Sequence, residues 1–285
     1  MAFTTGVTKN PLDVYTHNGI FDRVILTPHM LGGTIATYWL DNRAVIAAEV
    51  QGPYNFYLEW AEHPDDDFIT VAGPSVDNIL IDTEQRRWSK LPHSVYRIRL
   101  EASNGVFYSD VNPVTGELNR HDWLIAKEII RREYLRLQRY VGTEGLYLGR
   151  MQWGPLCTEC TDYNTEMVSN PNCTTCYGTG FIGGYYPAST LWVGEDRTNV
   201  RSQRQDGVGV VNDQSQTARV VAFPFLTAQD VWVNPTTGER WIIQTKQEVA
   251  AMRGKPLIWD IELRLEQPGS IIYSIPLTSD SSSSS

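Results

Sequence analysis

The chain has 285 residues, enough for one large domain or about two to three small ones. Hydrophobic residues make up 41% of it and aromatic residues 11%, which excludes a wholly disordered chain. The net charge of −9 argues against sequence-independent binding to DNA, because such binding neutralises phosphates with lysine and arginine.

The N-terminal residues and the hydropathy pattern carry no signal for export or for a membrane. No basic patch precedes an apolar run at the N-terminus, so we expect no secretory signal. No apolar stretch approaches the roughly 20 residues needed to span a bilayer, so we expect no membrane partner. We therefore expect the chain to fold in a reducing cytoplasm.

The first third of the chain is predicted to hold an arm and then a β-sandwich. Residues 1–33 mix Gly, Pro and Asn, and we expect an arm that orders against a partner. Across residues 34–118, short runs rich in Val, Ile, Tyr and Phe alternate with turn residues about every eight to twelve positions, which indicates a sandwich. The strands are expected at residues 44–50, 55–60, 68–72, 79–82 and 96–102.

One strand of this sandwich resembles part of a known fold. Leu91, Pro92 and Tyr96 lead into the alternating residues 97–102, and the stretch resembles the penultimate strand of fibronectin type III domains. Trp60, at the end of an early predicted strand, fits the same pattern. The resemblance implies a two-sheet sandwich in which Tyr96 is the corner tyrosine.

Residues 121–141 are predicted to form a helix. Asn119 or Asp122 can cap its start, and Gly142 suits a left-handed stop. An apolar stripe is expected to face the core. It comprises Leu124, Ile125, Ile129, Ile130, Leu135, Leu137 and Val141.

The same helix holds the main concentration of positive charge in the chain. The cations are Lys127, Arg131, Arg132, Arg136 and Arg139. They indicate either a solvated face with favourable charge toward the helix C-terminus, or a face that meets an acidic neighbour or nucleic acid.

The last third is predicted to begin with a polar loop and to continue as a small β domain. Residues 186–218 are polar and irregular in pattern, which indicates a long loop or an extended arm. Strands are expected at residues 219–223, 230–234, 240–246, 257–265 and 271–275. The serine run at the C-terminus is expected to be disordered.

Four cysteines provide the most specific signal in the sequence. Cys157, Cys160, Cys173 and Cys176 follow the pattern C-x2-C-x12-C-x2-C, in which two knuckles can complete a tetrahedron around structural zinc. The stretch from Cys173 through Gly178 and Gly180 resembles the zinc-binding repeat of the cysteine-rich domain of DnaJ-type chaperones.

Three other interpretations of these cysteines remain open. Two disulfides would need an oxidising compartment. A thioredoxin-like redox pair would need a βαβ setting, and a catalytic zinc would leave one coordination position open and would usually include histidine.

No catalytic motif is found in the sequence, so we expect no enzyme. The run Asp65-Asp66-Asp67 is either an acidic solvated turn or a calcium ligand set. The histidines are scattered and do not pair at ligand spacing.

Two stretches resemble structural proteins of tailed bacteriophages. The first runs from Leu148-Gly149-Arg150 through the four cysteines to Tyr185, and is similar to a cysteine-rich segment of contractile-tail phage proteins. The second, residues 230–257, resembles the small β-barrel of head-closure and neck proteins, with Glu239 inserted between Gly238 and the Arg240-Trp241 pair.

This resemblance implies a virion protein of the neck or collar that is assembled in the host cytoplasm. Its partners would be further copies of itself, in a ring or multi-copy assembly, and neighbouring portal-side and tail-side virion proteins, with no sequence-specific contact to nucleic acid. The alternatives are a baseplate or tail protein and a zinc-containing cytoplasmic binding module.

The expected fold class is mainly β: a fibronectin III/Ig-like sandwich, one helix, a zinc-knuckle insertion and a C-terminal small β-barrel. The expected divisions are residues 1–33 (arm), 34–118 (sandwich), 119–145 (linking helix), 146–190 (four-cysteine segment), 191–278 (loop and barrel) and 279–285 (serine-rich tail).

Overall fold

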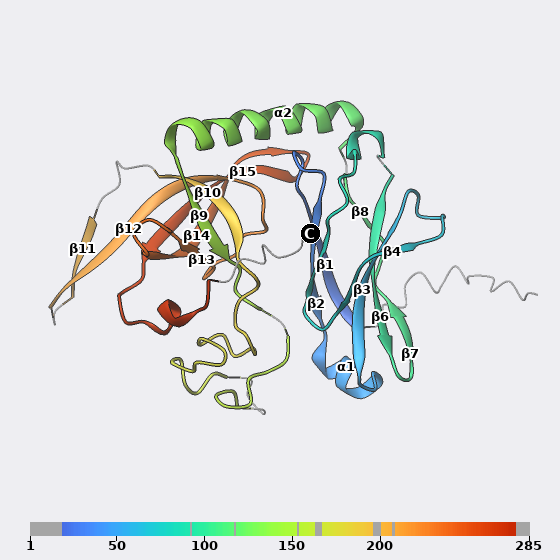
Figure 1. Ribbon diagram of the computed structural model, residues 1–285, viewed down its shortest axis with the longest axis horizontal. Coiled ribbons are helices and arrows are strands. Elements are labelled where there is room, and N and C mark those ends of the chain that lie inside the picture. Colours follow the sequence, from blue (N-terminus) through green and yellow to red (C-terminus); the bar gives the residue numbers. More distant parts are fainter. Residues whose placement is uncertain are drawn as a thin grey trace, which may run out of the picture. The chain divides into compact units, whose positions relative to one another are not determined.

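The computed structural model describes residues 19–91, 93–116, 118–152, 154–162, 167–195, 201–206 and 209–277 (Figure 1). These residues form two compact units, and the fold is mainly β, as predicted. Unit 1 comprises residues 19–26, 37–82 and 93–113, and unit 2 comprises residues 27–36, 83–91 and 114–277. None of the described helices is long and apolar enough to cross a bilayer.

Unit 1 is built on two sheets whose strand order is that of a fibronectin type III-like sandwich. The first sheet has the order β1 (Phe21–Pro28), β2 (Ile35–Asp41), β5 (Ile79–Asp82). The second has the order β4 (Ile69–Ser75), β3 (Tyr54–Ala61), β6 (Val95–Ala102), β7 (Gly105–Tyr108), with the short β8 (Asn112–Pro113) also paired to β6.

The core of unit 1 follows from the alternation of side chains along β3 and β6. Phe56 pairs with Leu100 and Leu58 with Ile98, and all four side chains are buried. The ring of Trp39, from the other sheet, lies 5.0 Å from that of Phe56, so the two sheets pack face to face.

Tyr96 lies at the position that the fibronectin resemblance gives to its corner tyrosine, and its hydroxyl bonds to a side chain 14 positions upstream. It is buried at the start of β6, and its hydroxyl donates a hydrogen bond to the Asp82 carboxylate at the end of β5, at 2.6 Å. This bond joins the two sheets, because β5 and β6 belong to different ones.

Two predictions for unit 1 are wrong. Residues 44–50 were expected to form a strand but lie in helix α1 (Arg43–Glu49), because the Asn42 side chain accepts a bond from the Val45 amide and the following residues include three alanines. The predicted arm contains strand β1, whose run of β-branched residues pairs with β2. Residues 1–18 of that arm lie outside the described residues.

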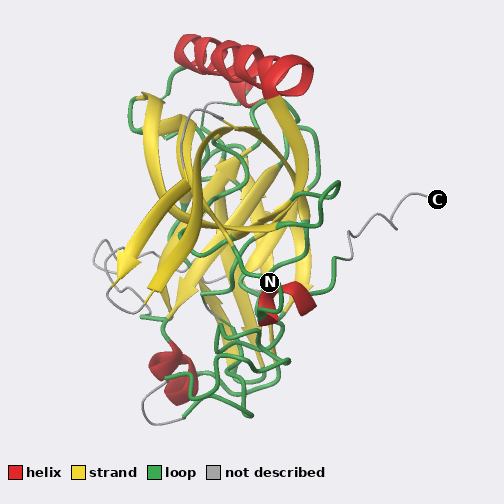
Figure 2. Cartoon of the chain, turned by 90° about the vertical axis from the view of Figure 1, so that its left-hand side faces the viewer, coloured by secondary structure: helices red, strands yellow, loops and turns green. Residues whose placement is uncertain are grey.

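Unit 2 is built around a closed barrel of six strands (Figure 2). Going round it, the strands are β10 (Ser189–Glu195), β9 (Gly142–Leu148), β13 (Val231–Val233), β14 (Arg240–Met252), β15 (Lys255–Leu265) and β12 (Gly209–Val221). β12 closes the barrel by pairing with β10, and it also forms a hairpin with β11 (Arg201–Asp206).

The barrel is filled by one apolar cluster. Its buried members are Tyr147, Leu191, Val193, Ala218, Val220, Leu226, Trp232, Ile243, Ile261 and Leu263. Gly145 is needed beside this cluster, since a Cβ there would lie 2.3 Å from the indole nitrogen of Trp232. That nitrogen donates to the Leu191 carbonyl at 3.3 Å.

Helix α2 (Arg120–Arg136) confirms the predicted helix and continues as a π-helical turn, η3 (Leu137–Val141). Figures 1 and 2 both show α2 lying across one end of the barrel, and it contacts β12, β15 and the short helix η2 (Trp88–Lys90). Of the two possible caps, Asn119 is the one used: its side chain accepts a bond from the Asp122 amide at 2.9 Å.

The predicted core stripe of this helix is wrong at three positions. The buried residues of α2 are Trp123, Ala126 and Ile130, while Leu124 and Ile125 are 49% and 40% exposed; a third stripe residue, Val141 at the end of η3, is 46% exposed. Helical periodicity permits stripes that differ by one position, and the larger ring of Trp123 is the side chain that enters the core.

Gly142 does not end the helix in a left-handed conformation. Its φ and ψ of −96° and 149° are extended, and it is the first residue of β9. The glycine is required by close packing, because a Cβ would lie 2.5 Å from the Leu137 carbonyl oxygen.

Two predictions for the C-terminal region are also wrong. The polar stretch 186–218 contains β10, β11 and most of β12, since antiparallel pairing with neighbouring strands satisfies its backbone. Residues 271–274 of the expected strand 271–275 form a 3-10 helix, η4 (Ile271–Ser274); the carbonyls of Ile272 in this helix and of Ile275 after it accept bonds from the buried Arg240 guanidinium. The serine-rich tail lies outside the described residues.

Candidate metal centre

The four cysteines lie in one long connection between two adjacent barrel strands, β9 and β10. These strands pair directly, with Tyr147 opposite Ser189, so both ends of the connection are fixed. The pairing continues beyond the barrel, where the Tyr186 amide donates to the Gly149 carbonyl at 2.8 Å and the Met151 amide to the Gly184 carbonyl at 2.9 Å.

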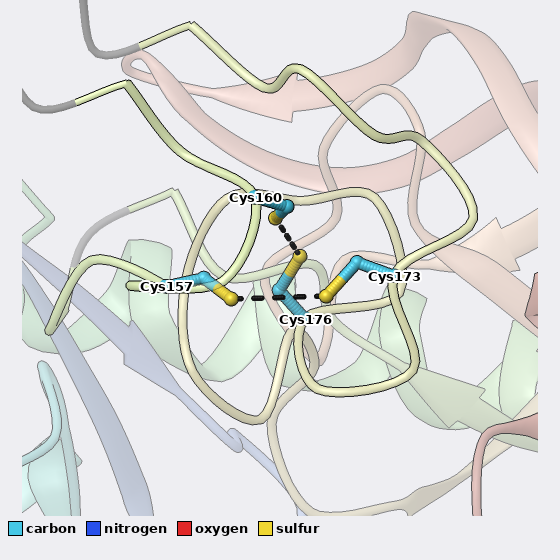
Figure 3. Close-up of side chains that lie close together, drawn as sticks. All are labelled: Cys157, Cys160, Cys173 and Cys176. Atoms are coloured by element: carbon cyan, nitrogen blue, oxygen red, sulfur yellow. Dashed lines mark hydrogen bonds between the residues drawn. The ribbon is translucent and has the colours of Figure 1, made fainter.

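The cysteine side chains converge on one point (Figure 3). All four sulfur atoms lie within 4.8 Å of one another; the Sγ atoms of Cys157 and Cys173 are 3.8 Å apart and those of Cys160 and Cys176 are 3.1 Å apart. A tetrahedron with metal–sulfur bonds of about 2.3 Å has sulfurs about 3.8 Å apart. The observed separations bracket that value, and all four cysteines are free thiols.

Each knuckle directs backbone amides at a sulfur. The Glu159 amide bonds to the Cys157 sulfur, and the amides of Thr175 and Cys176 bond to the Cys173 sulfur. Each turn is closed by a bond to the carbonyl of its first cysteine, from Thr161 at 3.1 Å and from Tyr177 at 2.8 Å. Amide donors of this kind stabilise thiolates, the form that binds metal.

The glycines after the second knuckle adopt the positive φ that a tight exit from the knuckle needs. Gly178 and Gly180 have φ of 76° and 86°, and a Cβ on Gly178 would lie 2.6 Å from the Pro171 carbonyl oxygen. The carbonyl of Gly180 then accepts a bond from the Cys157 amide at 2.8 Å, which holds the two knuckles together.

The electrostatics of the cluster favour a cation at its centre. None of the four cysteines is more than 5% exposed. Burial raises the pKa of the Cys157 and Cys160 thiols, while the amides of Cys176 and Thr175 lower the pKa of Cys173 to about 7. Because buried thiolates cannot share so small a volume without a compensating positive charge, the donor set fits a bound metal ion.

Apolar packing contributes little to this segment. Among the described residues, Val168 is the partly buried hydrophobic side chain that packs against the cysteines. The carboxylate of Glu159 lies 3.7 Å from the Cys173 sulfur and accepts a bond from the Thr175 hydroxyl at 2.6 Å. The four cysteines, and not an apolar core, are therefore the main structural centre of this segment.

The other sequence candidates do not form a comparable cluster. Within the described ranges, the cysteines are the one group of three or more metal-binding side chains close enough to share an ion. Asp65, Asp66 and Asp67 are exposed, and the Asp66 carboxylate closes a turn by accepting a bond from the His63 amide at 3.1 Å. His63 does stack on His93, at 5.3 Å between ring centroids, a proximity that sequence spacing could not reveal.

Sequence reasoning missed a buried carboxylate at the base of the cysteine segment. Asp230 is 1% exposed and accepts bonds from the Tyr147 hydroxyl, the Arg150 amide, and the amide and hydroxyl of Thr227. Burial raises its pKa to about 6. The Arg150 bond fixes the residue at which the chain leaves the barrel for the cysteine segment.

A scan against models of protein families and a search of curated proteins each returned no match. The geometry of the site and the fold around it therefore carry the functional argument.

Proposed function

We propose that this chain is a structural subunit of a tailed-bacteriophage virion, located in the neck or collar, which acts by protein–protein assembly and not by turnover. The observation that carries the proposal is the joining of a small closed barrel to a four-cysteine insertion between two of its neighbouring strands. The stretch that resembles head-closure and neck barrels, residues 230–257, forms β13, β14 and the start of β15.

We further propose that the metal is zinc and that its role is structural. Four thiolates at tetrahedral spacing are a ligand set typical of zinc, and they leave no coordination position open for a substrate. The ion would hold the connection between β9 and β10 in one conformation, so that the segment can serve as a fixed binding surface. Met167 and Ile182, both large and exposed, lie on this segment and fit a binding role.

The proposal is tested in particles produced by the genome that encodes the chain. Antibodies raised against the purified protein should label the head–tail junction in electron micrographs, and a nonsense mutation in its gene should give separate heads and tails. Cys173→Ser should reproduce the joining defect, whereas Thr174→Ser, at an exposed neighbouring position, should not.

Other outcomes would assign the chain elsewhere. Label at the far end of the tail would make it a baseplate protein. A protein found in the host cytoplasm and absent from particles would support the zinc-containing binding module, although the carboxylate of Glu159 beside Cys173 makes the knuckles a poor surface for nucleic acid.

A further inference from the structure

The outward face of α2 carries a stripe of side chains that the fold leaves uncovered. Leu124 and Ile125 are exposed although both are large and aliphatic. One turn further on, the Glu128 carboxylate accepts hydrogen bonds from Arg131 and Arg132 at 2.7 to 2.8 Å. Residues spaced in this way share one face of a helix. We call these five residues the α2 stripe; it has an apolar end and a cationic end.

The stripe is distinct from the core-facing side of the helix. Trp123, Ala126 and Ile130 are the residues that α2 buries within unit 2. On the stripe, the Arg132 side chain is 76% exposed. From Arg120 to Val141 the chain has six cations against three carboxylates, an excess of positive charge in a protein whose net charge is −9.

A surface of opposite character lies on unit 1, in the turn between β3 and β4. Residues 62–67, which we call the acidic turn, hold four carboxylates and no lysine or arginine, and all six residues are exposed. Two hydrogen bonds between His63 and Asp66, each of 3.1 Å, fix the shape of the turn. Ile69, which follows it, is 51% exposed. This surface therefore combines anionic groups with an apolar side chain.

We propose that the α2 stripe of one copy of the chain binds the acidic turn of a second copy. Arg131 and Arg132 face the carboxylates of the turn, and Leu124 and Ile125 face Ile69. The two surfaces differ, so the contact is head-to-tail, and repetition of it gives a ring or an open chain. The inference rests on the proposed assembly function and names the contact by which copies of the chain would associate.

Chemical complementarity favours a second copy of the chain over nucleic acid as the partner that binds the α2 stripe. A duplex would offer phosphates to the arginines, but its charged and hydrated backbone offers Leu124 and Ile125 no apolar side chain comparable to Ile69. The acidic turn complements the cationic end of the stripe, and Ile69 complements its apolar end. Copies of a chain with a net charge of −9 repel one another on average, and this contact opposes like-charge repulsion by bringing unlike charges together.

The test is a reciprocal charge reversal in the full-length, zinc-loaded protein, with association measured by analytical ultracentrifugation. Wild-type association should weaken between about 0.1 M and about 1 M salt, as the Debye length falls from about 10 Å to about 3 Å. Arg132→Glu and Asp65→Lys should each lower the association constant about tenfold, equivalent to about 1.4 kcal/mol. The combined variant should recover most of that loss.

Two further variants separate this contact from general effects. Arg23→Glu makes the same charge change at an exposed position in β1 and should leave association unchanged. Leu124→Gln removes apolar surface without altering charge and should weaken association. Zinc content and circular dichroism should match the wild type in every variant.

Several results would overturn the inference. These are a wild-type chain that stays monomeric, equal weakening by Arg23→Glu, or no recovery in the combined variant. Binding of a DNA duplex that Arg132→Glu abolishes, without self-association, would assign the stripe to nucleic acid instead. A monomeric chain would leave the proposed virion role standing, because label at the head–tail junction tests that role separately.

Discussion

Replacing Cys173 by serine removes one ligand of the proposed zinc site with little change in shape. The sulfur lies 3.8 Å from that of Cys157 and receives bonds from the amides of Thr175 and Cys176. Structural zinc contributes about 10–16 kcal/mol at pH 7 in zinc-finger peptides. An equal share for each of four thiolates is about 2.5–4 kcal/mol, so zinc affinity should fall by a factor of roughly 70 to 900.

Loss of zinc should unfold the segment and spare the barrel. Among the described residues, Val168 is the partly buried apolar side chain that packs against the cysteines. The barrel, in contrast, has its own buried cluster of ten side chains. We therefore expect new protease cleavage sites between Met151 and Tyr185 in Cys173→Ser, with the barrel still resistant.

The assay combines limited proteolysis, read by mass spectrometry, with zinc transfer to a chromogenic chelator. Thr174→Ser is the matched control, because its side chain is exposed in the same knuckle and provides no sulfur. Equal zinc affinity in Cys173→Ser and wild type, or equal protease resistance with and without metal, would refute the reasoning.

Three further outcomes are expected. Zinc binding at pH 7 should release at least about two protons, because burial keeps Cys157 and Cys160 protonated until metal binds. Calorimetry in buffers of different ionisation enthalpy measures the number of protons released, and a release of fewer than about one proton would contradict the prediction. Asp230→Asn should destabilise unit 2 by about 2 kcal/mol in denaturant titrations, because its amide group would face a backbone N–H donor in either orientation. In the wild type, the free energy of unfolding should fall as pH rises from about 4 to about 6, the range between the unfolded and the raised folded pKa of the Asp230 carboxyl. Asp230→Asn should remove this pH dependence. Tyr96→Phe should destabilise unit 1 by about 1–2 kcal/mol through loss of the bond to Asp82, leaving zinc affinity unchanged; unaltered thermal unfolding would count against the corner role.

The features that local sequence determines were predictable. The knuckles require two short cysteine spacings and glycines at positive φ, and the cysteines and glycines all lie between Cys157 and Gly180 in the chain. Strands β3, β5 and β6 are short runs rich in β-branched or aromatic residues, and β6 also alternates apolar and polar residues, so they could be located from sequence. Asn119 gave the start of α2 because a cap acts on residues within one turn.

Features that depend on distant residues were not predictable. Helix α1 is an exception: its apolar run fits a strand or a helix, and the Asn42 cap that decides for the helix is a local signal that the strand prediction did not use. The polar strands β11 and β12 form because they pair with each other. Asp230 receives bonds from residues 80 and 83 positions away, so its role appears only after the barrel closes.

The most direct test of the central claim is native mass spectrometry of the purified protein, with and without a chelator. We expect one zinc ion per chain, lost on chelation and lost at a lower chelator concentration from Cys173→Ser. A chain free of metal and four hydrogens lighter than the reduced form would mean that Cys157, Cys160, Cys173 and Cys176 form two disulfides, and it would contradict the zinc site.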